Sequence, residues 1–106
     1  MSGPLGDMGN LLAQAQKMQK AMGEAKAALA NERVSGTAGG GAVTVEFDGS
    51  GQALKVAISK EAYGAGLQDM QELVLMAVKD GQAKAERLRE QRMGDVTGGL
   101  NLPGLL

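Results

Sequence analysis

The side chains best suited to chemistry in this 106-residue chain are lysines and arginines, which gather in two segments. Between Lys17 and Arg33, four cations stand against two carboxylates, and between Lys84 and Arg92 four cations again stand against two. Each segment is therefore basic, although the formal net charge of the whole chain is −1. Clustered cations of this kind can bind the phosphate oxygens of a nucleic acid. Contacts to the phosphates of a duplex weaken as salt rises and depend little on base sequence.

A second interpretation of the same charges requires no partner. The segment 67–83 holds one cation and three carboxylates, so the second predicted helix is acidic in its N-terminal part and basic in its C-terminal part. This arrangement complements a helix dipole, and neighbours such as Glu86 and Arg89 stabilise an exposed helix by themselves. Charge alone leaves both interpretations open. Because the chain has one Phe, one Tyr and no Trp, stacking on single-stranded bases is disfavoured.

Residues for catalysis or metal binding are scarce. The chain has no His and no Cys, which removes the commonest general base, the commonest transition-metal ligand and thiolate chemistry. No nucleotide-binding P-loop occurs, and the glycine clusters at 39–41 and 49–51 fall in predicted turns. Glu46 and Asp48 could hold Mg²⁺ or act as an acid–base pair, but a solvated strand face with Glu46 diagonal to Lys55 is favoured. We expect no enzymatic activity, no cofactor, no metal and no small-molecule substrate.

The elements that must position the basic segments are organised around a predicted β-hairpin. Two runs with alternating apolar residues flank Asp48–Gly51, whose glycines suit a tight turn. Pairing around this turn places Val45 opposite Leu54 and sends the apolar residues of both strands to one buried face. A shorter run, Arg33–Ala38, adds a third, edge strand to an antiparallel sheet.

Long helices are predicted on both sides of the strands. The first begins at Asn10 and ends near Glu32, with apolar residues at alternating spacings of four and three that form a narrow seam of coiled-coil type. The second begins near Leu67 and ends near Met93, and its first half is apolar almost all the way round. Gly81, in the middle of the second helix, is expected to mark a bend.

The two ends of the chain are rich in glycine. Residues 1–9 and 94–106 are therefore expected to be flexible, which leaves residues 10–93 as one small domain. No basic-then-apolar leader opens the chain, and no apolar run approaches the ~20 residues of a membrane span. We expect a soluble, intracellular protein with no membrane partner.

The lengths of these elements predict assembly. Two helices of more than ~30 Å cannot both be covered by strands that span ~20 Å. A second copy of the chain is the simplest cover, because two-fold homodimers are the commonest oligomers. The apolar residues expected in the dimer interface are Met18, Met22, Leu73, Leu75 and Met76.

Three stretches of the chain carry a family resemblance. They read LLAQAQKMQ at 11–19, GGGAVTV at 39–45 and TGGLNLPG at 97–104. In this order and spacing the chain resembles the YbaB/EbfC family of bacterial nucleoid-associated proteins. The similarity extends from about Gly9 over nearly the whole chain.

The resemblance implies an α+β protomer of order α-β-β-β-α, in which a three-stranded antiparallel sheet is flanked by two long helices. It also implies a tweezer-like homodimer that binds double-stranded DNA and can alter its conformation. The family is associated with nucleoid organisation, gene regulation and DNA protection, and it is cytoplasmic and without catalytic activity. Its DNA-binding surface is assigned to projecting helices, and the matching residues here are Lys17, Lys20, Lys26, Lys84, Arg87, Arg89 and Arg92. An alternative is a dimeric interaction module whose arms and leucine-rich tail engage a protein partner.

Overall fold

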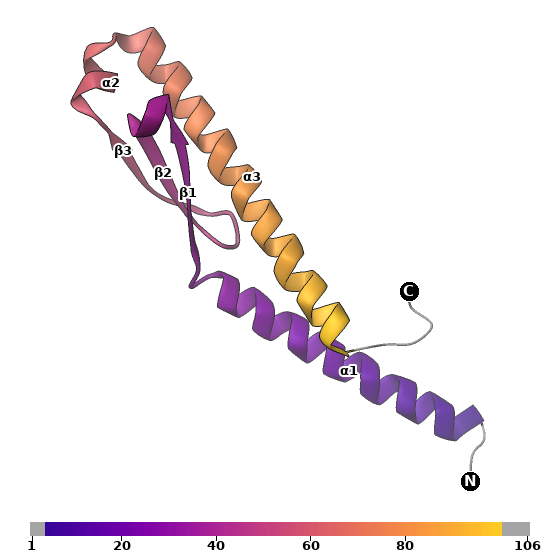
Figure 1. Ribbon diagram of the computed structural model, residues 1–106. Coiled ribbons are helices and arrows are strands. Elements are labelled where there is room, and N and C mark those ends of the chain that lie inside the picture. Colours follow the sequence, from indigo (N-terminus) through magenta and orange to yellow (C-terminus); the bar gives the residue numbers. More distant parts are fainter. Residues whose placement is uncertain (1–3, 101–106) are drawn as a thin grey trace.

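The computed structural model describes the backbone of residues 4–100 and the side chains of residues 7–98. It confirms the predicted α+β layout, with three antiparallel strands between two long helices, and adds one short helix (Figure 1). Helix α3 lies along one face of the sheet, whereas α1 leaves the end of the sheet as an arm. The elements are α1 (Pro4–Leu29), β1 (Arg33–Ala38), β2 (Val43–Asp48), β3 (Ala53–Ile58), α2 (Lys60–Gly64) and α3 (Leu67–Leu100), with a 3-10 turn at Gly39–Gly41.

The strands are ordered β1-β2-β3, so β2 is central and β3 is an edge. Val45 lies opposite Val56 and not opposite Leu54, so the predicted pairing is wrong by two residues. The turn is longer than predicted because one carboxylate oxygen of Asp48 accepts hydrogen bonds from two later backbone N–H groups. A register irregularity between Glu46 and the next residue adds to the shift. Because the shift is even, the apolar residues of both strands still share a face.

Helix α3 packs against β1 and β2 at very close range. A Cβ atom added at Gly81 would overlap the Phe47 ring, and one added at Gly36 would overlap the Ala77 carbonyl oxygen. Helix α3 continues through Gly81 without a break, and Figure 1 shows no sharp bend in it, contrary to the prediction. The glycine is there because the strand and the helix approach too closely for a side chain.

Helix α1 is longer at its start and shorter at its end than predicted. It begins at Pro4 and not at Asn10, because a proline in the first turn of a helix loses no intrahelical hydrogen bond. It ends at Leu29 and not near Glu32, and the Leu29 carbonyl oxygen accepts a hydrogen bond of 2.9 Å from the backbone N–H of Gly49. The β2–β3 turn thus caps the end of α1.

Helix α3 continues beyond the predicted end at Met93 as far as Leu100. Residues 94–100 are therefore helical where a glycine-rich tail was expected. The remainder of that predicted tail, residues 101–106, lies outside the described residues, as do residues 1–3 of the predicted N-terminal segment.

Strand β3 keeps an uncovered apolar face. Because α3 lies over β1 and β2, the side chains of Leu54, Val56 and Ile58 are 46%, 52% and 43% exposed. Val56 and Ile58 pair with the fully buried Val45 and Val43 on the central strand. The sequence predicted a buried face along β3, and within one protomer this prediction is wrong.

Candidate nucleic-acid interface

Helix α1 presents Lys17, Lys20 and Lys26 to solvent. Among the described residues of α1, only Leu29 is buried, Met18, Ala21 and Ala25 are half-buried, and the remaining side chains are exposed. None of the three lysines forms an ion pair with another residue in the described part of the chain. An ammonium group on a flexible four-carbon stem can follow an irregular line of phosphates, so these three lysines are available to an anionic ligand.

Two of the predicted DNA-binding cations on α3 are already paired within the protomer. Lys84 Nζ lies 3.0 Å from Asp80 Oδ2 and donates a hydrogen bond of 3.0 Å to the carbonyl oxygen of Ser35 on β1. The guanidinium of Arg92 donates a hydrogen bond of 2.6 Å to Glu32 Oε1, and this carboxylate raises the pKa of Arg92. A phosphate would have to compete with a carboxylate at each of these positions.

The other two cations of α3 differ in exposure. Arg87 is exposed and has no ion-pair partner among the described residues. Arg89 is half-buried against the β2–β3 turn, where a Cβ atom on Gly51 would lie 2.7 Å from its Nη1 atom. Gly51 also has φ +97°, a conformation that side chains disfavour. The glycine therefore leaves room for the turn and for the guanidinium above it.

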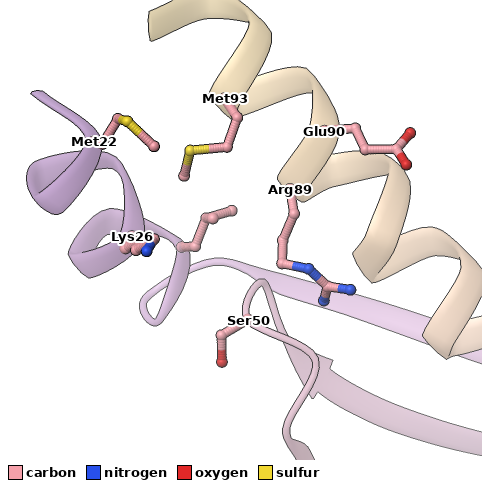
Figure 2. Close-up of a pocket in the computed structure, with 7 residues that line it drawn as sticks. Met22, Lys26, Ser50, Arg89, Glu90 and Met93 are labelled. Carbon is pink, nitrogen blue, oxygen red and sulfur yellow. The ribbon is translucent and has the colours of Figure 1, made fainter. Parts of the chain in front are cut away.

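Basic residues of both helices line one pocket (Figure 2). It has a volume of ≈ 500 Å³ and opens between α1, α3 and the β2–β3 turn. Met22, Leu29 and Met93 give it an apolar lining, and Lys26 of α1 and Arg89 of α3 also line it. Of the predicted site residues, the structure places these two basic side chains on one pocket although they are far apart in the sequence.

The carboxylates considered for metal binding or acid–base chemistry serve the fold. Asp48 Oδ1 accepts a hydrogen bond of 2.6 Å from the Ser50 hydroxyl, which is the main reason that the pKa of Asp48 is lowered. Glu46 Oε1 lies 3.5 Å from the guanidinium of Arg33, and Glu46 pairs directly with Lys55 instead of diagonally. The described residues contain no group of three or more His, Cys, Asp or Glu placed to hold a metal ion.

The residues predicted for a dimer interface fall into two groups. Leu73 packs against the core of its own protomer. Leu75 and Met76 are 54% and 57% exposed, Met22 is exposed on α1, and Met18 is half-buried there. The exposed residues of β3 were not among those predicted, because alternation identifies the apolar face of a strand but not the element that covers it.

Within the residues that the structure describes, no helix is long and apolar enough to cross a lipid bilayer.

Comparison with known proteins complements this geometry. The model of the YbaB/EbfC DNA-binding family matches residues 5–100. A nucleoid-associated protein of Alkaliphilus metalliredigens is 39% identical over 100 residues, which covers 93% of this chain and 88% of that protein. A nucleoid-associated protein of Saccharopolyspora erythraea is 41% identical over 109 residues, which covers 93% and 94%. The crystal structure of an uncharacterised protein from Helicobacter pylori shares the fold, with a TM-score of 0.74 and 23% identity over 92% of this chain and 100% of that one.

Proposed function

The chain belongs to the YbaB/EbfC DNA-binding family, and from this premise we propose that it binds double-stranded DNA through phosphate contacts, largely without sequence specificity, and alters DNA conformation. The observation that carries this proposal is a helical arm whose Lys17, Lys20 and Lys26 are exposed and unpaired in the described part of the chain. The protein would act in the cytoplasm, on the nucleoid, in nucleoid organisation, gene regulation and DNA protection. It would act without catalysis, since the family is a DNA-binding family and not an enzyme family.

Counterion release would supply most of the affinity. Each Lys or Arg that neutralises a phosphate releases condensed cations, a gain that shrinks as salt rises. Lys26 and Arg89 line one pocket from two helices, so a DNA backbone that crosses the mouth of the pocket would meet cations of both helices. Lys84 and Arg92 would contribute less, because each is already bonded to a carboxylate. The main contacts would be Lys17, Lys20, Lys26, Arg87 and Arg89.

We further propose that the protein binds DNA as a homodimer in which β3 forms part of the interface. Leu54, Val56 and Ile58 lie about half-exposed on an edge strand, on the same side as the buried residues of the central strand. Contiguous apolar patches of this kind mark interaction sites on soluble proteins. A second copy would cover the patch with an identical one across a two-fold axis.

The positions of exposed apolar residues around the axis of α3 indicate which of them lie nearer this patch. Asp80 bonds the Thr37 backbone N–H of β1, whereas Arg89 lies against the turn that leads into β3. At ~100° per residue, Leu75 falls within about 40° of Arg89 and Met76 within about 40° of Asp80. Leu75 therefore lies on the side of α3 nearer β3 and is the better candidate for an interface that includes β3, while Met76 lies on the side nearer β1.

The experiment that tests the proposed function is a binding titration by fluorescence anisotropy at low salt with two duplexes of unrelated sequence. We expect similar affinities for both duplexes and a loss of affinity for both as salt rises. No binding at low salt, together with a protein partner recovered with the chain, would instead support the interaction module. A large difference between the duplexes would contradict the lack of sequence specificity.

A further inference from the structure

We propose that Arg92 acts on DNA binding as a positioning residue: its bond to Glu32 helps to fix the direction in which α1, the arm, leaves the body, which we define as the sheet together with α3. The inference rests on the proposed DNA-binding function and reassigns one of its predicted contacts. It concerns the root of the arm, which we define as residues 29–33, between the last residue of α1 and the first residue of β1.

Backbone carbonyl oxygens of the root accept hydrogen bonds from a backbone N–H group of the β2–β3 turn and from one side chain. The Gly49 N–H donates to the carbonyl oxygens of both Leu29 and Glu32, at 2.9 and 3.0 Å. The Arg33 guanidinium donates to the carbonyl oxygens of Ala30 and Glu32, each at 3.0 Å. These bonds come from the β2–β3 turn and from the root itself, and several share a single donor group. They locate the end of α1 but leave its direction weakly constrained.

The bond between Arg92 and Glu32 adds an attachment from α3. The two residues are 60 positions apart, and their side chains are 37% and 32% exposed. The second carboxylate oxygen of Glu32 is buried and has no hydrogen-bond partner among the described residues. Because this carboxylate is partly removed from water, loss of the guanidinium would leave a charge poorly compensated, so the pair resists opening.

Side-chain packing holds the arm only in part. Leu29 is the only buried residue among the described residues of α1, whereas Met18, Ala21 and Ala25 are half-buried and α1 contacts α3 directly. Beside Leu29 a pocket of ≈ 500 Å³ opens between the two helices. Fully interdigitated side chains would hold two helices at a set angle, and the pocket interrupts such packing next to the root. The direction of α1 therefore depends on the polar contacts at the root as well as on this partial packing.

A small change of direction would matter to the lysines of the arm. Lys17 lies about 18 Å from Leu29 along the helix axis at ~1.5 Å per residue. A swing of about 10° at the root would move Lys17 by about 3 Å, which is the length of one hydrogen bond. An arm held in one direction presents its lysines to DNA without a loss of conformational freedom at binding.

The test compares Glu32→Gln with the matched control Glu24→Gln. Both variants remove one carboxylate, and Glu24 lies exposed on α1 without an ion-pair partner in the described chain. Positioning predicts that Glu32→Gln binds DNA about three- to tenfold more weakly, despite its added positive charge, while Glu24→Gln binds as well as the native protein or better. Arg92→Gln breaks the same bond and also removes a cation, so it should bind DNA at least as weakly as Glu32→Gln, and the double variant should be no weaker than Arg92→Gln. Tighter binding by Glu32→Gln would show that a freed Arg92 contacts DNA, and would overturn the proposal.

A second readout follows the arm itself in the absence of DNA. Since the chain has no cysteine, spin labels at Gln16→Cys and Gln82→Cys report the distance between α1 and α3, with excess unlabelled protein to suppress distances between protomers. We expect a broader distance distribution in Glu32→Gln and Arg92→Gln than in Glu24→Gln. An unchanged distribution would refute positioning even if DNA binding is confirmed. Failure of the native protein to bind DNA would refute the proposed function. The distance distributions would still decide whether the bond between Arg92 and Glu32 holds the direction of α1.

Discussion

The two long helices of this protein meet the rest of the molecule in opposite ways. Helix α3 approaches the sheet so closely that Gly36 and Gly81 are required between them, and its Ala77 and Ala85 are fully buried. Helix α1 buries only Leu29 among its described residues. Helix α3 is positioned by steric fit against the sheet, whereas α1 is positioned by hydrogen bonds at its C-terminal end and by a smaller contact with α3. Stability thus belongs mainly to the packed part of the molecule, whereas ligand contact belongs to cations that packing leaves free, which among the described residues are the lysines of α1 together with Arg87 and Arg89 of α3.

The largest expected effect concerns the body. Gly36→Ala should lower the free energy of unfolding by about 3 kcal/mol or more, because the new methyl group would meet backbone atoms of α3 that cannot move aside. Gly23→Ala is the matched control on the arm, where the added Cβ would meet no atom within 4 Å apart from the adjoining backbone of its own helix. It should stabilise α1 by up to ~1 kcal/mol. Urea denaturation at one fixed protein concentration measures the free energy of unfolding of both variants. Equal changes in the two variants would contradict the difference in packing between body and arm.

The second prediction concerns the uncovered face of β3. Val56→Glu would place a carboxylate in the proposed interface of each protomer and should weaken dimerisation by about a hundredfold or more. Ala57→Glu, the next residue along the strand and on its opposite face, should leave the dimer intact. Sedimentation equilibrium at micromolar concentration distinguishes them. A native protein that sediments as a stable monomer would remove the basis for the interface.

The third prediction concerns the arm. Lys17→Gln/Lys20→Gln should weaken DNA binding about tenfold or more at low salt, and reduce the salt slope by ~0.9 for each phosphate that is no longer neutralised. Lys60→Gln/Lys79→Gln removes the same charge from exposed positions of α2 and α3 and should have a much smaller effect. Anisotropy titrations at several salt concentrations give both quantities. Equal reductions of affinity in the two variants would mean that net charge, and not the arm, determines binding.

The smallest effect concerns the turn that caps the arm. The Ser50 hydroxyl and the Gln52 backbone N–H are the main causes that lower the pKa of Asp48 in the folded protein. The ionised carboxylate therefore stabilises the fold at a pH above the ordinary Asp pKa of about 3.9, and this stabilisation is lost as the pH falls through the lower pKa of the folded state. Asp48→Asn should therefore flatten the decrease in melting temperature below about pH 4. Some decrease should remain, because the pKa of Asp80 is also lowered, chiefly by the Thr37 backbone N–H. Identical melting curves across this range would contradict the assignment.

The strands and helices could be predicted from the sequence because their signals are local. Alternation at Val43, Val45 and Phe47 identifies β2, and the apolar seam identifies α1. The pairing of β3 could not be predicted, since the hydrogen bonds of Asp48 lengthen the turn and a register irregularity adds one residue. The apolar pattern within one strand also cannot reveal that α3 covers β1 and β2 and leaves β3 uncovered.

The candidate site was predictable in composition but not in detail. The clustering of basic residues identifies the two segments, yet a sequence cannot distinguish a free cation from a paired one. Lys84 bonds a carbonyl group 49 positions away and Arg92 a carboxylate 60 positions away. Such contacts are created by the fold, as is the pocket that Lys26 and Arg89 both line.

The proposed division, in which exposed cations of the helices contact DNA and the sheet only supports them, is tested most directly by an NMR titration of the isotopically labelled protein with a short duplex. We predict that the largest shifts fall on Lys17 to Lys26 of α1 and around Arg87 and Arg89 of α3, with little change in the strands. Shifts centred on the strands, with α1 unperturbed, would contradict this division.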